Sequence, residues 1–199
     1  MPSSPRATPA RDSYHHGSLR AALLDGARAM LAERGTSGFS LNALARRLGV
    51  STAAPYRHFA DRDALLDALA DEGYGAFGAG LEAAVRASSD PRDRLHRIGV
   101  AYLAFAAENP AIFQIMFADR EGRPAEAGPP TFQPLVQAVV DARDAGALPP
   151  GTDALVASRT IWAVLHGLAV LESRAGLAKL GLSDTHERLV ADAFALLLR

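Results

Sequence analysis

The sequence contains no cysteine among its 199 residues. Disulfide bonds, thiol nucleophiles and thiolate metal sites are therefore excluded. β-branched residues are sparse, whereas alanine, leucine and arginine dominate, which favours helices throughout. The first thirteen residues lack the apolar segment of a secretory signal. No apolar run reaches the roughly 20 residues that a membrane span needs. We therefore expect an all-α, cytoplasmic protein without a membrane partner.

Signatures of enzymes are also absent from the sequence. It shows no paired carboxylates, nucleophile–base set, metal-ligand cluster or P-loop. Residues 73–78 read GYGAFG and fit the pattern G-x-G-x-x-G. A dinucleotide site would also require a preceding strand and a βαβ unit, which the sequence does not predict. We expect no enzyme activity, no catalytic residue, no cofactor and no bound metal.

The net charge of −1 is distributed unevenly along the chain. Residues 1–63 hold nine arginines and five acidic residues, a net charge of +4, whereas residues 64–199 carry −5. Such an asymmetry suits a protein that contacts phosphates with its N-terminal part. A charge of +4 is too small to decide the matter alone, because chance also produces it.

Residues 39–69 predict a helix, a short turn, a second short helix and the start of a third. Ser40 can cap the first of these helices, and Gly49 ends it in a left-handed conformation. The apolar stripe between them consists of Leu41, Leu44, Ala45 and Leu48. Ser51 caps the next helix, Thr52 to His58. Tyr56 and Phe59 are expected to face back toward the stripe. Asp61 caps the third helix.

This is a helix-turn-helix arrangement, in which the second helix enters a DNA major groove. The same spacing also occurs in structural αα-hairpins, so the pattern alone leaves DNA binding open. Residues 14–35, YHHGSLRAALLDGARAMLAERG, and residues 39–66, FSLNALARRLGVSTAAPYRHFADRDALL, resemble the N-terminal domain of TetR-family transcriptional regulators. The resemblance extends to about Leu69. It implies a homodimeric, ligand-responsive repressor that binds a palindromic operator in double-stranded DNA and a small-molecule effector.

The first helix is predicted to start near Gly17 or Ser18 and to end at Gly35. Its buried stripe is Leu19, Leu23, Ala27, Met30 and Leu31. His15 and His16 then precede the helix, where its free N–H groups favour phosphate contact over metal binding. The complete set of predicted DNA-binding residues is His16, Ser40, Arg46, Arg47, Ser51, Thr52, Ala53, Pro55, Tyr56, His58 and Arg62.

Within this set the arginines are candidate phosphate contacts, together with Arg57. For any one of these arginines, an ordinary solvated surface residue is an equally good interpretation. Thr52, Ala53, Pro55, Tyr56 and His58 are the candidates to face the bases, with thymine methyl contact and DNA shape contributing to recognition. Pro55 is expected to shorten and stiffen this helix.

The domains are predicted to be a disordered basic tail over 1–13, a helix-turn-helix domain over 14–63, and a helical ligand-binding and dimerisation domain over 64–199. Further helices are expected over 62–88, from Pro91, over 108–117, from Phe132 to near Gly146, over 153–174 and from Ser183. Residues 119–131 read as a mobile loop.

Large apolar side chains from several of these helices predict a mainly apolar ligand cavity, although a filled core is an equal alternative. The predicted ligand-binding residues are Phe77, Tyr102, Phe105, Phe113, Met116, Phe117, Trp162 and His166. ENPAIFQIMF and IWAVLHGLAVLE resemble the C-terminal domain of a TetR subgroup named for its Trp-His-Gly signature. Trp162 and His166 share a helix face, and a core tryptophan packed on a satisfied histidine is the favoured alternative to ligand contact.

The helix 153–174 is apolar almost all round, which predicts burial on two sides, one of them by a second copy of the chain. With the last helix it would form half of an intersubunit four-helix bundle. The predicted dimer-interface residues are Leu165, Leu168, Val190, Phe194 and Leu197. The sequence thus favours a transcriptional regulator, and a helical protein-interaction module without sequence-specific DNA binding is the alternative.

Overall fold

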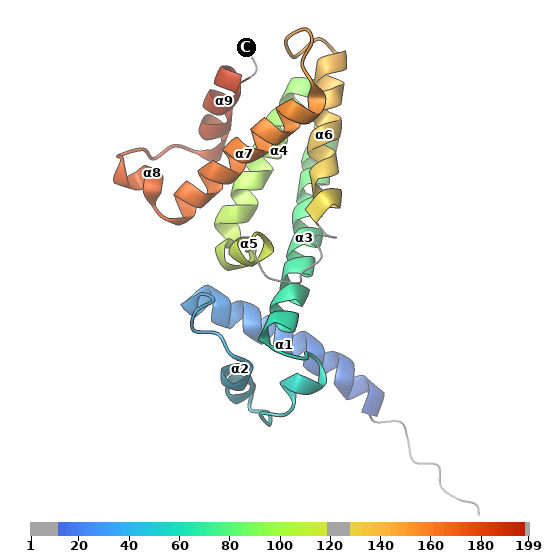
Figure 1. Cartoon of the computed structure of the whole chain (residues 1–199), viewed down its shortest axis with the longest axis vertical. Coiled ribbons are helices and arrows are strands. Elements are labelled where there is room, and N and C mark those ends of the chain that lie inside the picture. The colour runs from blue at the N-terminus through green and yellow to red at the C-terminus, as the bar shows by residue number, and fades with distance from the viewer. Residues whose placement is uncertain (1–11, 119–127, 198–199) are drawn as a thin grey trace, which may run out of the picture. The chain divides into compact units, whose positions relative to one another are not determined.

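The computed structural model describes residues 12–118 and 128–197. These residues form helices without any strand, which confirms the predicted all-α class (Figure 1). The elements in chain order are α1 (Asp12–Arg34), α2 (Leu41–Leu48), the 3-10 helix η1 (Pro55–Arg57), α3 (Arg62–Arg86), α4 (Pro91–Glu108), α5 (Pro110–Met116), α6 (Gly128–Asp144), α7 (Ala154–Ser173), α8 (Gly176–Lys179) and α9 (His186–Leu197). The chain divides into two compact units, Met1–Leu69 and Ala70–Arg199, so the boundary follows Leu69 rather than residue 63.

The first unit is built from α1, α2, η1 and the start of α3. The Ser40 Oγ accepts a hydrogen bond from the Ala43 N–H at 3.2 Å and caps α2, as predicted. Gly49 ends the same helix at a φ of 67°, in the left-handed region that glycine adopts at least cost. The core of the unit includes Leu23, Leu31, Leu44 and Leu65, which are fully buried.

The predicted start of α1 at Gly17 or Ser18 is wrong. The helix begins at Asp12, and residues 12–34 contain no proline that would interrupt it. Asp12 and Ser13 are therefore helical rather than part of a disordered tail, whose other residues lie outside the described chain. His16 is the fifth residue of the helix, beyond the four N–H groups that lack an acceptor. The helix end therefore does not support phosphate contact by His16, whose DNA-binding role stays a prediction.

The second unit has α4 as its central helix. α4 contacts α6, α7 and α9, and in Figure 1 α7 crosses in front of it. Its buried face includes Leu95, Ile98 and Leu103. At Asn109 the chain bends by 107° into α5, because Pro110 has no N–H with which to continue α4.

Two predicted boundaries in this unit are also wrong. Residues 128–131, assigned to a loop, form the first turn of α6, and the rest of that loop lies outside the described residues. α9 begins at His186 rather than Ser183, because Thr185 caps it by accepting from the Arg188 N–H at 3.3 Å. The short helix α8 was not predicted.

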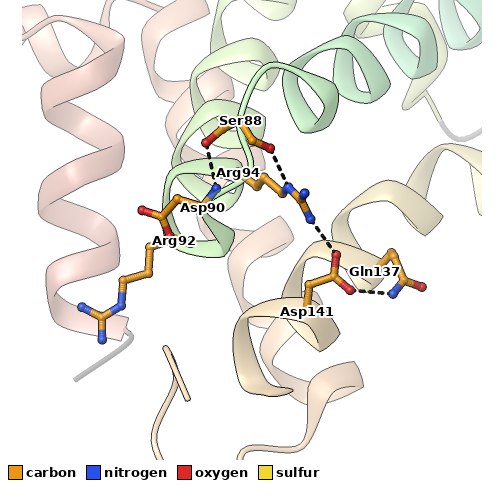
Figure 2. A network of polar contacts seen from close by, with 6 residues as sticks. All are labelled: Ser88, Asp90, Arg92, Arg94, Gln137 and Asp141. Carbon is orange, nitrogen blue, oxygen red and sulfur yellow. Dashed lines mark hydrogen bonds and ion pairs between the residues drawn. The ribbon is translucent and has the colours of Figure 1, made fainter. Parts of the chain in front are cut away.

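Arg94 ties α4 to α6 and to the loop before α4, as Figure 2 shows. Its Nε donates to the Ser88 carbonyl at 2.8 Å, and its Nη1 donates to Asp141 Oδ2 at 3.1 Å. Gln137 donates to the other oxygen of Asp141 at 2.8 Å. Asp90, the predicted cap of α4, accepts from the Arg92 N–H at 3.0 Å. The position of α6 against α4 therefore rests on a half-buried ion pair as well as on apolar packing.

α7 buries one face and exposes the other. Ser158, Ile161, Leu165 and Ala169 are buried, one helical turn apart. The helix is long and apolar enough to cross a membrane by length and composition, and α4 with α5 would pass the same test if counted as one bent span. The expectation that no apolar run reaches this length is therefore wrong for α7. A single such helix is weak evidence for a membrane span, because core helices pass the same test.

Candidate DNA interface and ligand cavity

The segment after α2 does not form the predicted α-helix Thr52 to His58. Residues 52–54 form a turn, and η1 follows with hydrogen bonds from residue i to i−3. The Ala54 N–H donates to the Ser51 carbonyl at 3.0 Å, and the His58 N–H donates to the Pro55 carbonyl at 3.0 Å. Pro55 has no N–H to bond the Ser51 carbonyl as an α-helix would require. The chain therefore takes the tighter 3-10 geometry.

This geometry decides which side chains face outward. Pro55 is buried, so its prediction as a base-contacting residue is wrong. Successive side chains in a 3-10 helix lie about 120° apart, so burial of Pro55 turns Tyr56 outward. Tyr56 is 50% exposed, so the prediction that it faces the α2 stripe is wrong. Phe59 is buried, in agreement with its predicted inward orientation. Thr52 and Ala53 are exposed, and His58 is half-buried.

Two of the predicted phosphate-binding arginines are held within the first unit. Arg47 donates two hydrogen bonds to Glu33, both at 2.7 Å. This pair holds the pKa of the Glu33 carboxyl below its usual range and raises the pKa of Arg47. Arg62 donates to the Thr36 carbonyl at 2.9 Å and to the Phe39 carbonyl at 3.3 Å. Arg62 therefore fixes the loop between α1 and α2.

Arg46 and Arg57 differ from this pair. Both are exposed, and neither makes a hydrogen bond or ion pair with another described residue. Ser40 uses its hydroxyl as the α2 cap, whereas Ser51 is exposed at the turn. Among the predicted phosphate contacts, Arg46 and Arg57 are thus the arginines without a partner in the described part of the chain. The exposed side chains around η1 include those of Thr52, Ala53 and Tyr56. Sequence reasoning did not separate Arg46 and Arg57 from Arg47 and Arg62, because partners distant in sequence decide the difference.

The second unit contains a cavity of about 570 Å³. This volume lies within the range of small-molecule sites. Its wall is formed by Tyr74, Phe77, Leu81, Ile98, Tyr102, Phe117, Thr131, Phe132, Leu135, Leu155, Arg159, Trp162 and Leu165. Four of the predicted ligand-binding residues are among them: Phe77, Tyr102, Phe117 and Trp162.

The other four predicted residues are not part of the wall. The Phe105 ring lies 5.0 Å from that of Phe77. The Phe113 and His166 rings lie 4.8 and 4.7 Å from that of Phe117. Met116 is buried, and its carbonyl accepts from the Tyr74 hydroxyl at 2.7 Å. These residues contact residues of the wall without lining it themselves, so their role as direct ligand contacts stays a prediction.

Tyr102 and His166 connect α4 to α7 behind the cavity. The Tyr102 hydroxyl lies 2.9 Å from His166 Nδ1, and the tautomer of the imidazole decides which of the two donates. Burial raises the pKa of Tyr102, and a hydrogen bond from Trp162 acts in the opposite direction. Burial lowers the pKa of His166. The hydrogen bond to Tyr102 agrees with the alternative of a satisfied histidine for His166, whereas Trp162 lines the cavity.

Sequence reasoning missed the parts of the wall contributed by α6 and the start of α7. Thr131 and Phe132 were assigned to a loop and to an amphipathic stripe, and the Phe132 ring lies 6.2 Å from that of Trp162. Leu155 and Arg159 were not considered. They precede Trp162 by seven and three residues on α7, a spacing that places all three on one helix face. That spacing was the available signal.

The predicted dimer-interface residues are mostly covered within the chain. Leu165 and Val190 are fully buried, and Phe194 is buried to 8% exposure. Val190 Cγ1 lies only 2.7 Å from where a Cβ on Gly99 would be, so α9 packs closely on α4 at this point. These three positions face the core of their own unit in the single chain, so their predicted place in a dimer interface gains no support from the burial. Leu168 is half-buried and Leu197 is exposed.

Comparisons with known families assign both units. Residues 23–69 match the sequence model of the bacterial regulatory proteins of the tetR family. Residues 95–197 match that of the tetracyclin repressor-like C-terminal domain. The chain belongs to the TetR family. It is a DNA-binding transcriptional regulator by fold and domain content.

Solved structures resemble this TetR-family protein over most of its length. A protein of unknown function from Rhodococcus sp. RHA1 is 36% identical, with a TM-score of 0.80 over 95% of this chain and 98% of that chain. The putative regulatory protein SCO4313 is 27% identical, with a TM-score of 0.74 over 96% of this chain and 99% of that one. The regulator FadR from Bacillus subtilis, solved with stearoyl-CoA, shares the fold alone: 16% identity and a TM-score of 0.71 over 89% of this chain and 97% of that one.

A curated relative matches only part of the chain. The nucleoid occlusion factor SlmA of Haemophilus influenzae is 30% identical over 84 residues, which are 42% of this chain and 38% of that protein. The match therefore spans about two fifths of the relative's length. It leaves the activity of the whole protein to be proposed from the site itself.

Proposed function

We propose that this TetR-family regulator is a homodimeric repressor that binds a palindromic operator and is released from it by a small, mainly apolar effector. The proposal rests on the observation that α3 belongs to both units, because the boundary between them falls after Leu69, inside this helix. The helix begins at Arg62, which fixes the loop ahead of α2, and it lines the cavity through Tyr74, Phe77 and Leu81. An effector in the cavity would contact the same helix that belongs to the DNA-binding unit. If the effector bound the protein more tightly with α3 in one position than in another, effector binding and DNA binding would be coupled.

The DNA contacts are proposed for the exposed residues around η1. Thr52, Ala53 and Tyr56 would face bases in the major groove, and Arg46 and Arg57 would contact phosphates. Two copies related by a two-fold axis would place these segments in successive major grooves, about 34–36 Å apart. The DNA partner would place the protein in the cytoplasm.

The homodimer is proposed from the apolar side chains that α7 and α9 leave uncovered. Leu155, Val156 and Leu171 on α7 and Leu196 on α9 are between 47% and 73% exposed. Of these four, Leu155 also lines the cavity, so Val156, Leu171 and Leu196 carry the argument. Exposed apolar side chains are typical of an interface. A second copy of the same two helices would cover them and complete a four-helix bundle.

The test is fluorescence polarisation with labelled duplexes tiled across the DNA that flanks the coding gene. We expect one palindromic duplex to bind at least a hundredfold more tightly than a scrambled duplex of the same composition, with an affinity that falls as salt rises. Thr52→Ala should lower binding to that duplex, and Arg188→Gln, on α9, is the matched control. A dimeric protein that binds every duplex equally weakly would instead support the protein-interaction module.

A further inference from the structure

The exposure of the cavity wall changes from one end to the other. Ile98 and Leu165 at the deep end are at most 1% exposed. At the rim Leu155 is 65% exposed, Trp162 is 37% exposed, and Arg159 is also exposed. A molecule that enters this cavity thus meets a mainly apolar interior and a charged rim.

The two tyrosine hydroxyls of the cavity wall already have hydrogen-bond partners within the protein. The Tyr102 hydroxyl is bonded to His166 Nδ1, and the Tyr74 hydroxyl donates to the Met116 carbonyl. A polar group of a ligand placed deep in the cavity would therefore lose water without gaining a partner, which is unfavourable. The apolar body of the ligand belongs in the interior, and its polar group belongs at the rim.

Arg159 is the one charged side chain in the described wall of the cavity. It makes no hydrogen bond or ion pair with another described residue. Other arginines of the same unit do have acidic partners, such as Arg94 with Asp141 and Arg97 with Asp93. A guanidinium left without an acid beside an apolar cavity matches a carboxylate, which it can bind through two parallel hydrogen bonds.

We propose that the cavity takes an amphipathic carboxylic acid, with its hydrocarbon body in the interior and its carboxylate paired with Arg159. This rests on the proposed function and specifies the class of effector. A cationic ligand would be repelled by Arg159. A neutral ligand of the same shape would forgo the ion pair.

The protein supplies its own reporter for this inference. Trp162 is the only tryptophan in the sequence, and it lies on the cavity wall three residues after Arg159. Its fluorescence can be titrated with decanoic acid, 1-decanol and decylammonium, each below its micelle-forming concentration. We expect the acid to bind about tenfold more tightly than the alcohol, a ratio equivalent to about 1.4 kcal/mol, and the ammonium to bind least.

Variants assign the preference to Arg159. Arg159→Gln should remove the difference between acid and alcohol while leaving the affinity for the alcohol unchanged, and Arg159→Lys should retain part of the difference. Arg92→Gln is the matched control, because Arg92 is exposed on α4 and lacks a charged partner among the described residues. The control should keep the full preference for the acid. Equal binding of acid and alcohol by the wild-type protein would overturn the proposal, as would a preference that survives in Arg159→Gln.

Parallel polarisation measurements separate this inference from the proposed function. If decanoic acid and decanol bind equally and both release the operator duplex, the repressor assignment stands and the acid preference is wrong. If the acid binds through Arg159 but no ligand changes operator affinity, the preference stands and release by effector is wrong. If none of the three compounds alters Trp162 fluorescence, the proposed ligand class is wrong irrespective of DNA binding.

Discussion

The Tyr102 hydroxyl and the Nδ1 atom of His166 are 2.9 Å apart and join α4 to α7 directly behind the cavity wall. The spacing of Trp162 and His166, four residues apart, now has a physical explanation. Trp162 faces the cavity, whereas His166 holds the tyrosine that forms part of its wall. The ligand-binding shape of the second unit therefore depends on a polar contact in an otherwise apolar region.

This contact predicts how stability depends on pH. Burial lowers the pKa of His166 in the folded protein, so the unfolded chain binds more protons once the pH falls below the usual histidine value of about 6.5. The stability that neutral His166 contributes is present above that value and is lost as the pH falls. We expect the thermal midpoint of the wild-type protein to fall more between pH 7 and pH 5 than that of His166→Gln. Equal falls would show that other groups control the acid sensitivity.

Tyr102→Phe provides the companion test at constant pH. The change removes the hydroxyl but keeps the ring, which packs edge-on against Phe77 with the centroids 5.1 Å apart. The loss of one hydrogen bond should cost about 1 kcal/mol of unfolding free energy, measured by urea denaturation. Tyr56→Phe, at an exposed residue of the first unit, is a control for removal of a tyrosine hydroxyl. A neutral Tyr102→Phe would mean that the contact with His166 adds nothing to stability.

The arginines of the first unit should separate into two groups. Arg62→Ala removes the guanidinium hydrogen bonds to the Thr36 and Phe39 carbonyls, so we expect it to lower the thermal midpoint as well as DNA affinity. Arg46→Ala and Arg57→Ala should leave the midpoint unchanged. Each should reduce the slope of log affinity against log salt by about one, because each removes one phosphate contact. Unchanged salt slopes in both variants would rule out this assignment of phosphate contacts.

Sequence reasoning succeeded where the relevant chemistry is local. Ser40, Gly49 and Asp90 cap or end their helices as predicted, because each acts on backbone groups within four residues of itself. It failed at η1, where a single missing N–H at Pro55 converts an α-helix into a 3-10 turn. It also failed to identify Arg159 as part of the cavity. Membership of that wall depends on where α6 and α7 meet, which no local pattern specifies.

The exposed apolar face of α7 and α9 predicts the oligomeric state. Val156→Asp places a charge where the proposed partner subunit would bury it, at 48% exposure in the single chain. We expect light scattering to show two chains for the wild-type protein at micromolar concentration and one chain for the variant. Arg92→Asp, which changes an exposed residue of α4 rather than of α7 or α9, serves as control. A Val156→Asp protein that remains a dimer would place the interface elsewhere.

The last prediction concerns the four glycines of α3, because the space around them differs. A Cβ on Gly73 would lie 2.6 Å from Ile112 Cγ2 and 2.9 Å from Met116 Sδ, so this glycine permits the close packing of α5. A Cβ on Gly75 would meet no atom within 4 Å. Glycine is unfavourable in a helix interior, so the alternative explanation for the glycines of α3 is a soft segment that acts as a hinge. Close packing explains Gly73 but not Gly75.

Gly73→Ala should destabilise the protein by roughly 1–3 kcal/mol through overpacking. Gly75→Ala should stabilise it by up to about 1 kcal/mol, because alanine suits a helix interior better than glycine. If softness at Gly75 lets α3 bend when an effector fills the cavity, Gly75→Ala should also keep operator binding and weaken release by the effector. Urea denaturation and operator release measured on the same variants check both expectations. A stabilised Gly75→Ala protein that releases the operator normally would mean that α3 moves as a rigid body and that its glycine segment is not a hinge.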